Sequence, residues 1–246
     1  MNSEQFSEGP KVEVRRTDDG SFTLFVPALG EHYHSTRGAR QESAHVFIRA
    51  GLGPVLAAGR GQPGRRPLRL LEAGLGTGLN ALLTLQAAQA AGAAVAYDGF
   101  ETQPLPPAVV GKLAPEWVGQ SPEAGALFAT LHAAPWHEAH PLAPSFFLTK
   151  IVAPVQEAAL PADYYDLIYF DAFAPEKQPE LWTAEVFARL YAAAAPGAVL
   201  VSYCAQGQFR RNLRAAGWRT EKLPGPPGKR EMTRAVKEGR SKGVNA

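Results

Sequence analysis

The chain has 246 residues, of which 46% are hydrophobic and 20% charged, so it can bury the core of one large domain or of one and a half, and it is neither disordered nor fibrous. Its single cysteine, Cys204, excludes an intramolecular disulfide framework and a cysteine-based zinc site. The N-terminus lacks the order of a secretory signal, and the apolar stretch 68–97 is interrupted by polar residues, so we expect a cytoplasmic protein without a membrane span.

The first 60 residues predict a small extension that is rich in β-structure. Residues 11–26 contain two β-prone runs separated by Asp19-Gly20, a turn signal, and therefore predict a hairpin. Apolar residues on one face predict a helix over about 41–50. Residues 51–67 are dense in Gly, Pro and Arg, which indicates a loop that enters the main domain.

The main domain, residues 61–246, alternates strands and helices. The apolar runs predict strands over 68–72, 93–100, 145–152, 165–170 and 198–204, and helices over 79–90, 183–194 and 208–216. The proline-rich residues 103–144 predict helices with insertions. Because the strands are apolar on both faces, we expect an α/β fold with a mostly parallel sheet and helices on both of its faces.

The formal net charge of +2 conceals an asymmetry along the chain. From Gln208 to Ala246, eleven lysines and arginines stand against three acids, which gives +8, whereas the other residues carry 14 basic and 20 acidic groups, or −6. A basic end on an acidic body is a candidate surface for a phosphate backbone. Taken alone, it is more typical of a solvated C-terminal helix followed by a frayed tail.

A glycine-rich turn, Gly74-Leu75-Gly76-Thr77-Gly78, connects the first strand of the main domain to its first helix. Glycines there let the backbone pass close to a ligand and leave the amides of the helix N-terminus free, although such turns also occur for packing alone. The spacing is GxGxG rather than the GxGxxG of dinucleotide sites, and Glu72 precedes it. That carboxylate suits the ammonium of S-adenosylmethionine (SAM) and would repel a pyrophosphate.

Two later strand ends add polar groups. Glu101 ends the second strand, where a carboxylate can accept both ribose hydroxyls of either NAD or SAM. Pro154 stands where an acid often contacts adenine, so such a contact would come from the backbone or from Gln156. Asp171 follows the fourth strand, in the crevice where such folds bind ligands, and either binds the SAM ammonium or the nucleophile, or caps a helix or loop.

Several residue runs together resemble the methyltransferase domain of the bifunctional tRNA 5-methylaminomethyl-2-thiouridine biosynthesis protein family (MnmC) and its stand-alone, MnmD-like relatives. The resemblance covers about residues 19–236. The runs are Tyr33-His34-Ser35 with Gly38-Ala39 and Glu42, then His45-Val46-Phe47, Glu72 to Asn80, Phe170 to Pro175 with Pro179 and Trp182, and Lys229-Arg230-Glu231-Met232.

The resemblance implies a class I SAM-dependent methyltransferase fold, which is Rossmann-like, and a set of site residues. By similarity, Glu72, Gly74, Gly76, Thr77, Gly78 and Asn80 line the methionine side of SAM, Glu101 holds the ribose, Asp171 lies beside the transferred methyl group, and Tyr33, Gly38 and Glu42 close over the cofactor. The implied reaction converts the 5-aminomethyl group of wobble (2-thio)uridine to 5-methylaminomethyl. Because the chain stops at Ala246, we expect no FAD and no oxidase activity.

The expected partner is the anticodon arm of tRNA, with no obligate protein partner. Within the basic segment, the leading contacts are Arg210, Arg211, Lys229 and Arg230. Tyr33, His34, Phe173 and Trp182 are candidates to stack on the target base. We expect no metal, because the six histidines lack a ligand pattern such as HExxH.

We expect Asp171 to orient the neutral amine and to stabilise the charge that develops on its nitrogen. Three other interpretations remain open. The chain is also compatible with a SAM enzyme that methylates a small amine or a protein, with a nicotinamide oxidoreductase, and with a non-catalytic RNA-binding protein.

Overall fold

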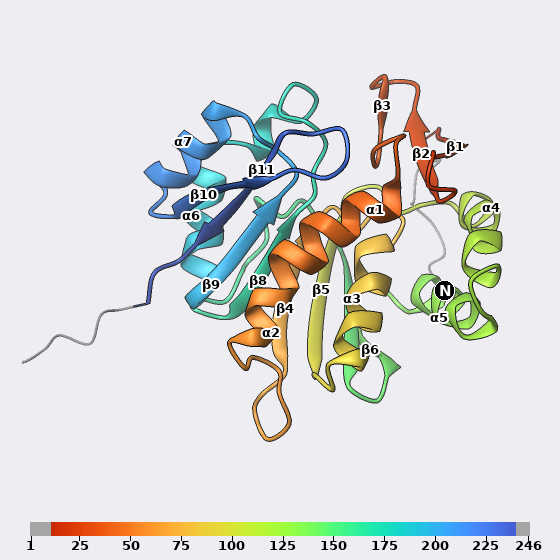
Figure 1. The fold of residues 1–246 in the computed structure, drawn as a ribbon, viewed down its shortest axis with the longest axis horizontal. Coiled ribbons are helices and arrows are strands. Elements are labelled where there is room, and N and C mark those ends of the chain that lie inside the picture. Colours follow the sequence, from red (N-terminus) through yellow and green to blue (C-terminus); the bar gives the residue numbers. More distant parts are fainter. Residues whose placement is uncertain (1–10, 240–246) are drawn as a thin grey trace, which may run out of the picture.

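The structure, a computed structural model, describes residues 11–239 (Figure 1). Residues 1–10 and 240–246, which include Arg240 and Lys242 of the basic segment, lie outside the described residues. Within residues 11–239, no helix has the length and apolar character needed to cross a membrane.

A small antiparallel sheet near the N-terminus has the strand order β1-β2-β3. It consists of β1 (Glu13–Arg16), β2 (Phe22–Val26) and the short β3 (Glu31–His32). The predicted hairpin is confirmed, and its turn is held by the Asp19 carboxylate, which accepts hydrogen bonds from the Thr17 hydroxyl at 2.7 Å and from Ser21 N at 3.0 Å.

The main sheet has eight strands in the order β10-β11-β9-β8-β4-β5-β7-β6. Its strands are β4 (Leu68–Ala73), β5 (Val95–Glu101), β6 (Ala139–Ala143), β7 (Phe146–Val152), β8 (Tyr165–Phe170), β9 (Ala194–Ser202), β10 (Arg219–Pro224) and β11 (Glu231–Val236). The central run β9-β8-β4-β5-β7 is parallel, and antiparallel strands flank it on both sides. The predicted parallel core is confirmed, whereas β6, β10 and β11 were not predicted.

Helices cover both faces of this sheet, as predicted (Figure 1). They are α1 (Ala39–Ser43), the π-helix η1 (Ala44–Leu52), α2 (Gly53–Ala57), α3 (Leu79–Ala90), α4 (Pro107–Val118), α5 (Pro122–Ala133), the 3₁₀ turn η2 (Pro179–Leu181), α6 (Ala184–Ala193) and α7 (Gly207–Ala215). Alternate strand residues serve the two faces: Tyr169 and Val201 pack with η1 and α3, whereas Phe170 and Leu200 pack with α6 and α7.

The helical run α1-η1-α2 joins the small sheet to the main one and shares the core of the latter. A Cβ at Gly51 would lie 2.8 Å from Val201 and 3.3 Å from the Tyr169 ring, so a glycine lets η1 lie directly on the sheet. The prediction of a loop from residue 51 is therefore wrong for 51–57. Pro54 is tolerated because it stands in the first turn of α2, where a missing N–H costs little.

The basic C-terminal segment also differs from expectation, because α7 is followed by the hairpin β10-β11 rather than by a frayed tail. Glu221 and Arg234 face each other across this hairpin, and Arg234 Nε donates to Glu221 Oε2 at 2.7 Å. Cross-strand ion pairs of this kind are compatible with an exposed sheet edge. Glu221 is already counted among the three acids of the segment, so its pairing with Arg234 leaves the net charge of +8 unchanged.

Candidate active site

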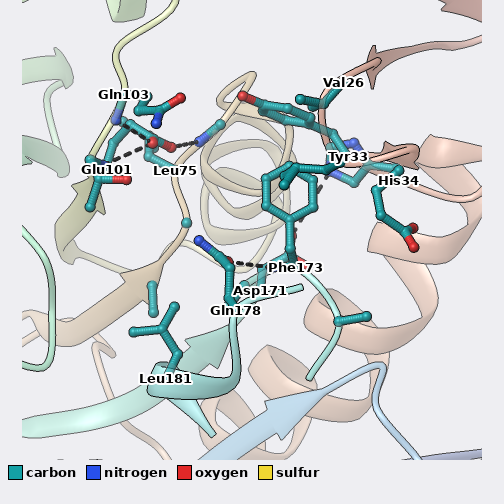
Figure 2. A pocket seen from close by; sticks show the side chains of 18 of the residues that line it. Val26, Tyr33, His34, Leu75, Glu101, Gln103, Asp171, Phe173, Gln178 and Leu181 are labelled. Atoms are coloured by element: carbon teal, nitrogen blue, oxygen red, sulfur yellow. Dashed lines mark hydrogen bonds and ion pairs between the residues drawn. The ribbon is translucent and has the colours of Figure 1, made fainter. Parts of the chain in front are cut away.

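A pocket of about 560 Å³ opens at the carboxyl ends of the parallel strands. Residues that directly follow β4, β5, β7 and β8 form one wall, and residues 31–36 of the N-terminal segment form another. Figure 2 shows Glu101 and Gln103 on one side of this pocket and Tyr33 and His34 on the other. Because parallel strands end at the same edge of a sheet, four distant segments meet here.

The glycine turn after β4 lies on the floor of the pocket. Gly74 has φ +94°, and a Cβ there would lie 2.5 Å from the carbonyl oxygen of Asp171, so only glycine fits. Gly76 has φ +52° and donates its N–H to Glu101 Oε2 at 2.9 Å. The two glycines therefore let the turn lie close to the backbone of Asp171 and to the carboxylate of Glu101.

Glu101 is held by three backbone amides. Besides Gly76, the N–H groups of Thr102 and Gln103 donate to Glu101 Oε1 at 2.8 Å each (Figure 2). Burial raises the pKa of Glu101, although these hydrogen bonds act in the opposite direction. The carboxylate is thus fixed in one orientation at the wall of the pocket.

Glu72 does not line the pocket, contrary to the expectation that its carboxylate meets the SAM ammonium. It is fully buried beneath the glycine turn and accepts hydrogen bonds from the Tyr97 hydroxyl at 2.7 Å and from Asn80 Nδ2 at 2.8 Å. Burial raises the pKa of Glu72 well above its usual range. Asn80 Nδ2 also donates to Asp171 Oδ2 at 2.7 Å, so Glu72 orients the amide that in turn holds Asp171.

Asp171 lies at the pocket floor with its side chain 8% exposed. Burial, together with the negative charge of Glu42, raises the pKa of Asp171 to about 7, whereas the Asn80 hydrogen bond and Lys229 act to lower it. The carboxylate therefore changes its charge near neutral pH. A group of this kind, placed in a cleft, is a candidate for proton transfer.

Glu42 and Lys229 meet above Asp171. Lys229 Nζ donates to Glu42 Oε1 at 2.5 Å, and Glu42 Oε2 accepts the N–H of Ser35 at 2.7 Å. The ammonium of Lys229 also lies 4.3 Å from the centre of the Tyr203 ring. Tyr203 was not singled out from the sequence, although it directly follows β9 at the same edge of the sheet and donates to the Ala172 carbonyl at 2.8 Å.

The aromatic candidates fall into two groups. Tyr33 and Phe173 line the pocket and meet edge to face with ring centres 5.1 Å apart. Trp182 is instead 4% exposed, packs against Phe170 and Phe209, and donates its indole N–H to the Phe173 carbonyl at 2.9 Å. Trp182 is therefore a core residue that supports the loop of Phe173, and it cannot stack on a base.

At the end of β7, the segment with Pro154 and Gln156 lines the pocket opposite the N-terminal segment. The Oε1 atom of Gln156 is buried and has no hydrogen-bond partner within residues 11–239. A buried acceptor without a donor indicates a missing ligand group, because such groups are almost always paired. The exocyclic amino group of adenine is a donor of the right type.

Besides Asn80, which contacts Asp171 from beneath the glycine turn, three further predicted cofactor residues lie outside the pocket wall. Thr77 is buried in the turn that precedes α3, and Gly78 is the N-cap of that helix, with φ +75°. Gly38 precedes α1, where a Cβ would lie 2.7 Å from the Asp19 carboxylate. These residues shape the backbone around the site rather than face it.

The structure separates the four predicted RNA contacts. Arg210 is buried and its Nη1 lies 3.1 Å from Glu231 Oε2, so it is not offered to a phosphate. Lys229, Arg211 and Arg230 are all exposed, and of these Lys229 pairs with Glu42. Arg37, which the sequence did not single out, lies against the loop that carries Arg230, because its Cδ is 2.6 Å from the position of a Cβ on Gly228.

This topology, with a ligand pocket beside the glycine turn, is the fold of SAM-dependent methyltransferases, and the predicted fold class is confirmed. Residues 143–238 match the family described as S-adenosyl-L-methionine-dependent methyltransferase. Two solved structures share the fold. MnmC2 from Aquifex aeolicus has a TM-score of 0.71 at 24% identity and covers 94% of this chain and 72% of that one. A spermidine synthase in complex with a transition-state analogue has a TM-score of 0.53 at 13% identity, with 94% and 71% covered.

In sequence, the chain is 34% identical over 229 residues to the tRNA 5-methylaminomethyl-2-thiouridine biosynthesis bifunctional protein MnmC of Aromatoleum aromaticum. The match covers 89% of this chain and 34% of that protein, so the chain spans about a third of the length of the curated relatives it matches. The resemblance to this family is confirmed.

Proposed function

We propose that this chain is a SAM-dependent tRNA methyltransferase that converts the 5-aminomethyl group of wobble (2-thio)uridine to 5-methylaminomethyl. The observation that carries the proposal is the place of Asp171, a buried carboxylate with a pKa raised to about 7 on the floor of the pocket. The names of the relatives and of the matching family support the substrate and the methyl donor.

The residues present fit SAM. Glu101 offers a fixed carboxylate for the ribose, Gln156 offers an unpaired acceptor for the adenine amino group, and the bend at Gly74 and Gly76 leaves room for the methionine end. When bound, SAM would supply a methyl carbon attached to a positively charged sulfur. The lone pair of an amine can attack that carbon, and the sulfur leaves as the neutral thioether of S-adenosylhomocysteine.

The chain's own residues must first free that lone pair. A primary alkylamine is mostly protonated at neutral pH and then has none. A carboxylate with a raised pKa is a stronger base than an ordinary aspartate, so Asp171 accepts the ammonium proton more readily. Asp171 passes this proton to water, and the ionised carboxylate then faces the positive charge that forms on nitrogen as the new N–C bond forms and the S–C bond of SAM breaks.

The tRNA partner requires a target base turned out of the anticodon stack and a basic surface near the pocket rim. Arg230 and Arg37 provide exposed positive charge on the two segments that meet beside Lys229. Arg211 adds a third exposed guanidinium on α7. We assign the phosphate contacts to these three arginines.

The test is methyl transfer from labelled SAM to tRNA that carries the 5-aminomethyl group. The matched acceptor is the same tRNA with an unmodified wobble uridine, and small primary amines form a third arm. We expect label only in the aminomethyl tRNA and none with the Asp171→Asn variant. Label in small amines but not in tRNA would favour the alternative, an N-methyltransferase for small amines, and full turnover by Asp171→Asn would refute the role of Asp171.

A further inference from the structure

His34 contributes a ring to the pocket wall that the proposed reaction does not yet use. Its side chain is 7% exposed, and Nε2 lies 3.9 Å from Asp171 Oδ2 (Figure 2). Within residues 11–239, its Nδ1 is buried without a hydrogen-bond partner. The ring is therefore enclosed next to the proposed catalytic carboxylate, and no group among residues 11–239 lies at hydrogen-bond distance from either of its nitrogens.

The backbone of His34, rather than its ring, holds the residue in place. His34 N donates to the Thr23 hydroxyl at 2.9 Å, and that hydroxyl donates back to the His34 carbonyl at 3.3 Å. On either side, Tyr33 N donates to the Leu24 carbonyl at 2.8 Å and Ser35 N to Glu42 Oε2 at 2.7 Å. The small N-terminal sheet thus presents the imidazole at a defined position, with Nε2 directed toward Asp171 at the pocket.

The burial of the His34 ring and its hydrogen-bond partners indicate its charge and which nitrogen carries the proton. Burial lowers the pKa of His34 to about 4, so the ring is neutral at pH 7 and its contact with Asp171 is not an ion pair. A neutral imidazole has one N–H and one acceptor nitrogen. Because Nδ1 is the fully buried nitrogen and a buried N–H without a partner is rarer in proteins than an underused acceptor, we assign the proton to Nε2, the nitrogen that faces Asp171.

The pocket floor therefore offers a donor and an acceptor side by side, His34 Nε2–H and the Asp171 carboxylate. A 5-aminomethyluracil presents the complementary pair, because the amine on C5 has N–H donors and the neighbouring C4 carbonyl is an acceptor. We propose that His34 donates to this ring carbonyl while Asp171 holds the amine, so that the site selects an aminomethyl group next to a carbonyl. This inference rests on the proposed function and makes His34 a specificity-determining residue.

A simple alkylamine would satisfy Asp171 and leave the N–H of His34 without an acceptor. Sites built to hydrogen-bond one substrate group reject analogues that lack it, because the buried polar group stays unpaired. The pair thus explains how a pocket with a carboxylate for amines would exclude the small amines of the cell. It also separates the two residues: Asp171 takes part in proton transfer, whereas His34 positions the base.

The experiment compares three variants with the wild-type protein on aminomethyl tRNA. His34→Leu removes the donor, and His34→Gln restores an N–H donor. His140→Leu is the matched control, because His140 lies on the edge strand β6 and does not line the pocket. For each protein, kcat and KM for tRNA are measured as functions of pH, and the Kd for SAM is measured by calorimetry.

We expect His34→Leu to lower kcat/KM about 10- to 100-fold, the range for one buried hydrogen bond, with the Kd for SAM within about twofold of wild type. The acid limb of the pH profile stays in place, since His34 carries no proton in the reaction. His34→Gln recovers part of the loss, and His140→Leu stays near wild type.

Several outcomes would overturn the inference. An unchanged kcat/KM in His34→Leu would do so, as would a failure of His34→Gln to recover activity. A SAM affinity that falls as far as kcat/KM would show that His34 contacts SAM rather than the base. A displaced acid limb of the pH profile would show that His34 itself takes part in proton transfer. In each of these cases wild-type turnover still stands. Wild-type protein that transfers no methyl group to aminomethyl tRNA refutes the proposed function instead, and the role of His34 falls with it.

Discussion

The ammonium of Lys229 and the carboxylate of Glu42 form an ion pair at 2.5 Å across 187 residues of sequence. Glu42 belongs to α1 near the N-terminus, and Lys229 belongs to the loop between β10 and β11 near the C-terminus. Both act on Asp171, the first by raising its pKa and the second by lowering it. The pair therefore closes one side of the pocket and also sets the electrostatic potential at its floor.

The first prediction concerns the pH dependence of methyl transfer. Because the base must be ionised, activity is lost as the pH falls through the pKa of Asp171, at about 7. Lys229→Met removes a positive charge, which raises that pKa and moves the acid limb of kcat/KM to higher pH. Glu42→Gln removes a negative charge and moves the limb to lower pH, and we expect each shift to be about 0.5–1 pH unit.

Titration of the substrate amine is the same in all proteins, so the difference between the two profiles belongs to the enzyme. The double variant Glu42→Gln/Lys229→Met should lie between the single variants. Two single variants that move the acid limb in the same direction would show that the pair acts through the shape of the pocket and not through charge.

The second prediction tests the glycine turn. Gly74→Ala places a Cβ 2.5 Å from the Asp171 carbonyl oxygen at φ +94°. We therefore expect the free energy of unfolding to fall by about 3 kcal/mol and the affinity for SAM to be lost. Gly92→Ala is the matched control, because Gly92 has φ +63° but no atom within 4 Å of a Cβ, and it should cost about 1 kcal/mol. Urea denaturation and calorimetry with SAM measure both, and equal losses would refute the close-contact argument.

The sequence predicted the part of the site that depends on strand ends. Gly74, Glu101 and Asp171 each follow an apolar run, and parallel strands bring such positions together whatever the loops do. The contact of Glu42 with Lys229 was beyond prediction, because the hairpin β10-β11 has few apolar residues and its charges obscure the strand pattern. The burial of Glu72 was missed for a similar reason: only the packing of Tyr97 and Asn80 decides which strand-end acid faces the ligand.

A third prediction concerns the adenine contact. Gln156→Leu removes the unpaired buried acceptor, and we expect it to weaken SAM binding about 10-fold. S-inosylhomocysteine, which lacks the exocyclic amino group, should bind the wild-type protein less tightly than S-adenosylhomocysteine, and the variant should lose this discrimination. The exposed Gln89→Leu, on α3, serves as control. Calorimetry that finds equal discrimination in both variants would assign adenine to other groups.

A fourth prediction tests the basic rim. Arg230→Gln should weaken tRNA binding and lower the slope of log K against log salt by about 1, because one phosphate contact is lost. Arg37→Gln should do the same, since the two residues lie on adjoining segments. Lys112→Gln, an exposed lysine on α4, is the control and should leave the slope unchanged. Filter binding at several salt concentrations measures the slopes for wild type and the three variants. A slope for Arg230→Gln equal to that of wild type would show that Arg230 does not contact a phosphate of the tRNA.

The last prediction follows from the raised pKa of Asp171, because a functional carboxylate held at about 7 costs stability. The folded state favours the protonated form, so this group's contribution is most favourable below pH 4 and declines as the pH rises through about 7. At pH 8, Asp171→Asn should therefore have a free energy of unfolding, measured by urea denaturation, about 1–3 kcal/mol higher than that of wild type. This gain should vanish near pH 4.

Asp19 gives the opposite case and serves as the control for Asp171. Burial acts to raise the pKa of Asp19, but its hydrogen bonds from Ser21, Thr17 and Gln41 outweigh this and lower it. Its contribution is present above the ordinary aspartate pKa and is lost in acid, so Asp19→Asn should destabilise the protein at pH 8 and less so at low pH. An Asp171→Asn variant that is also less stable at pH 8 would mean that the carboxylate supports the fold, and that its burial is structural rather than catalytic.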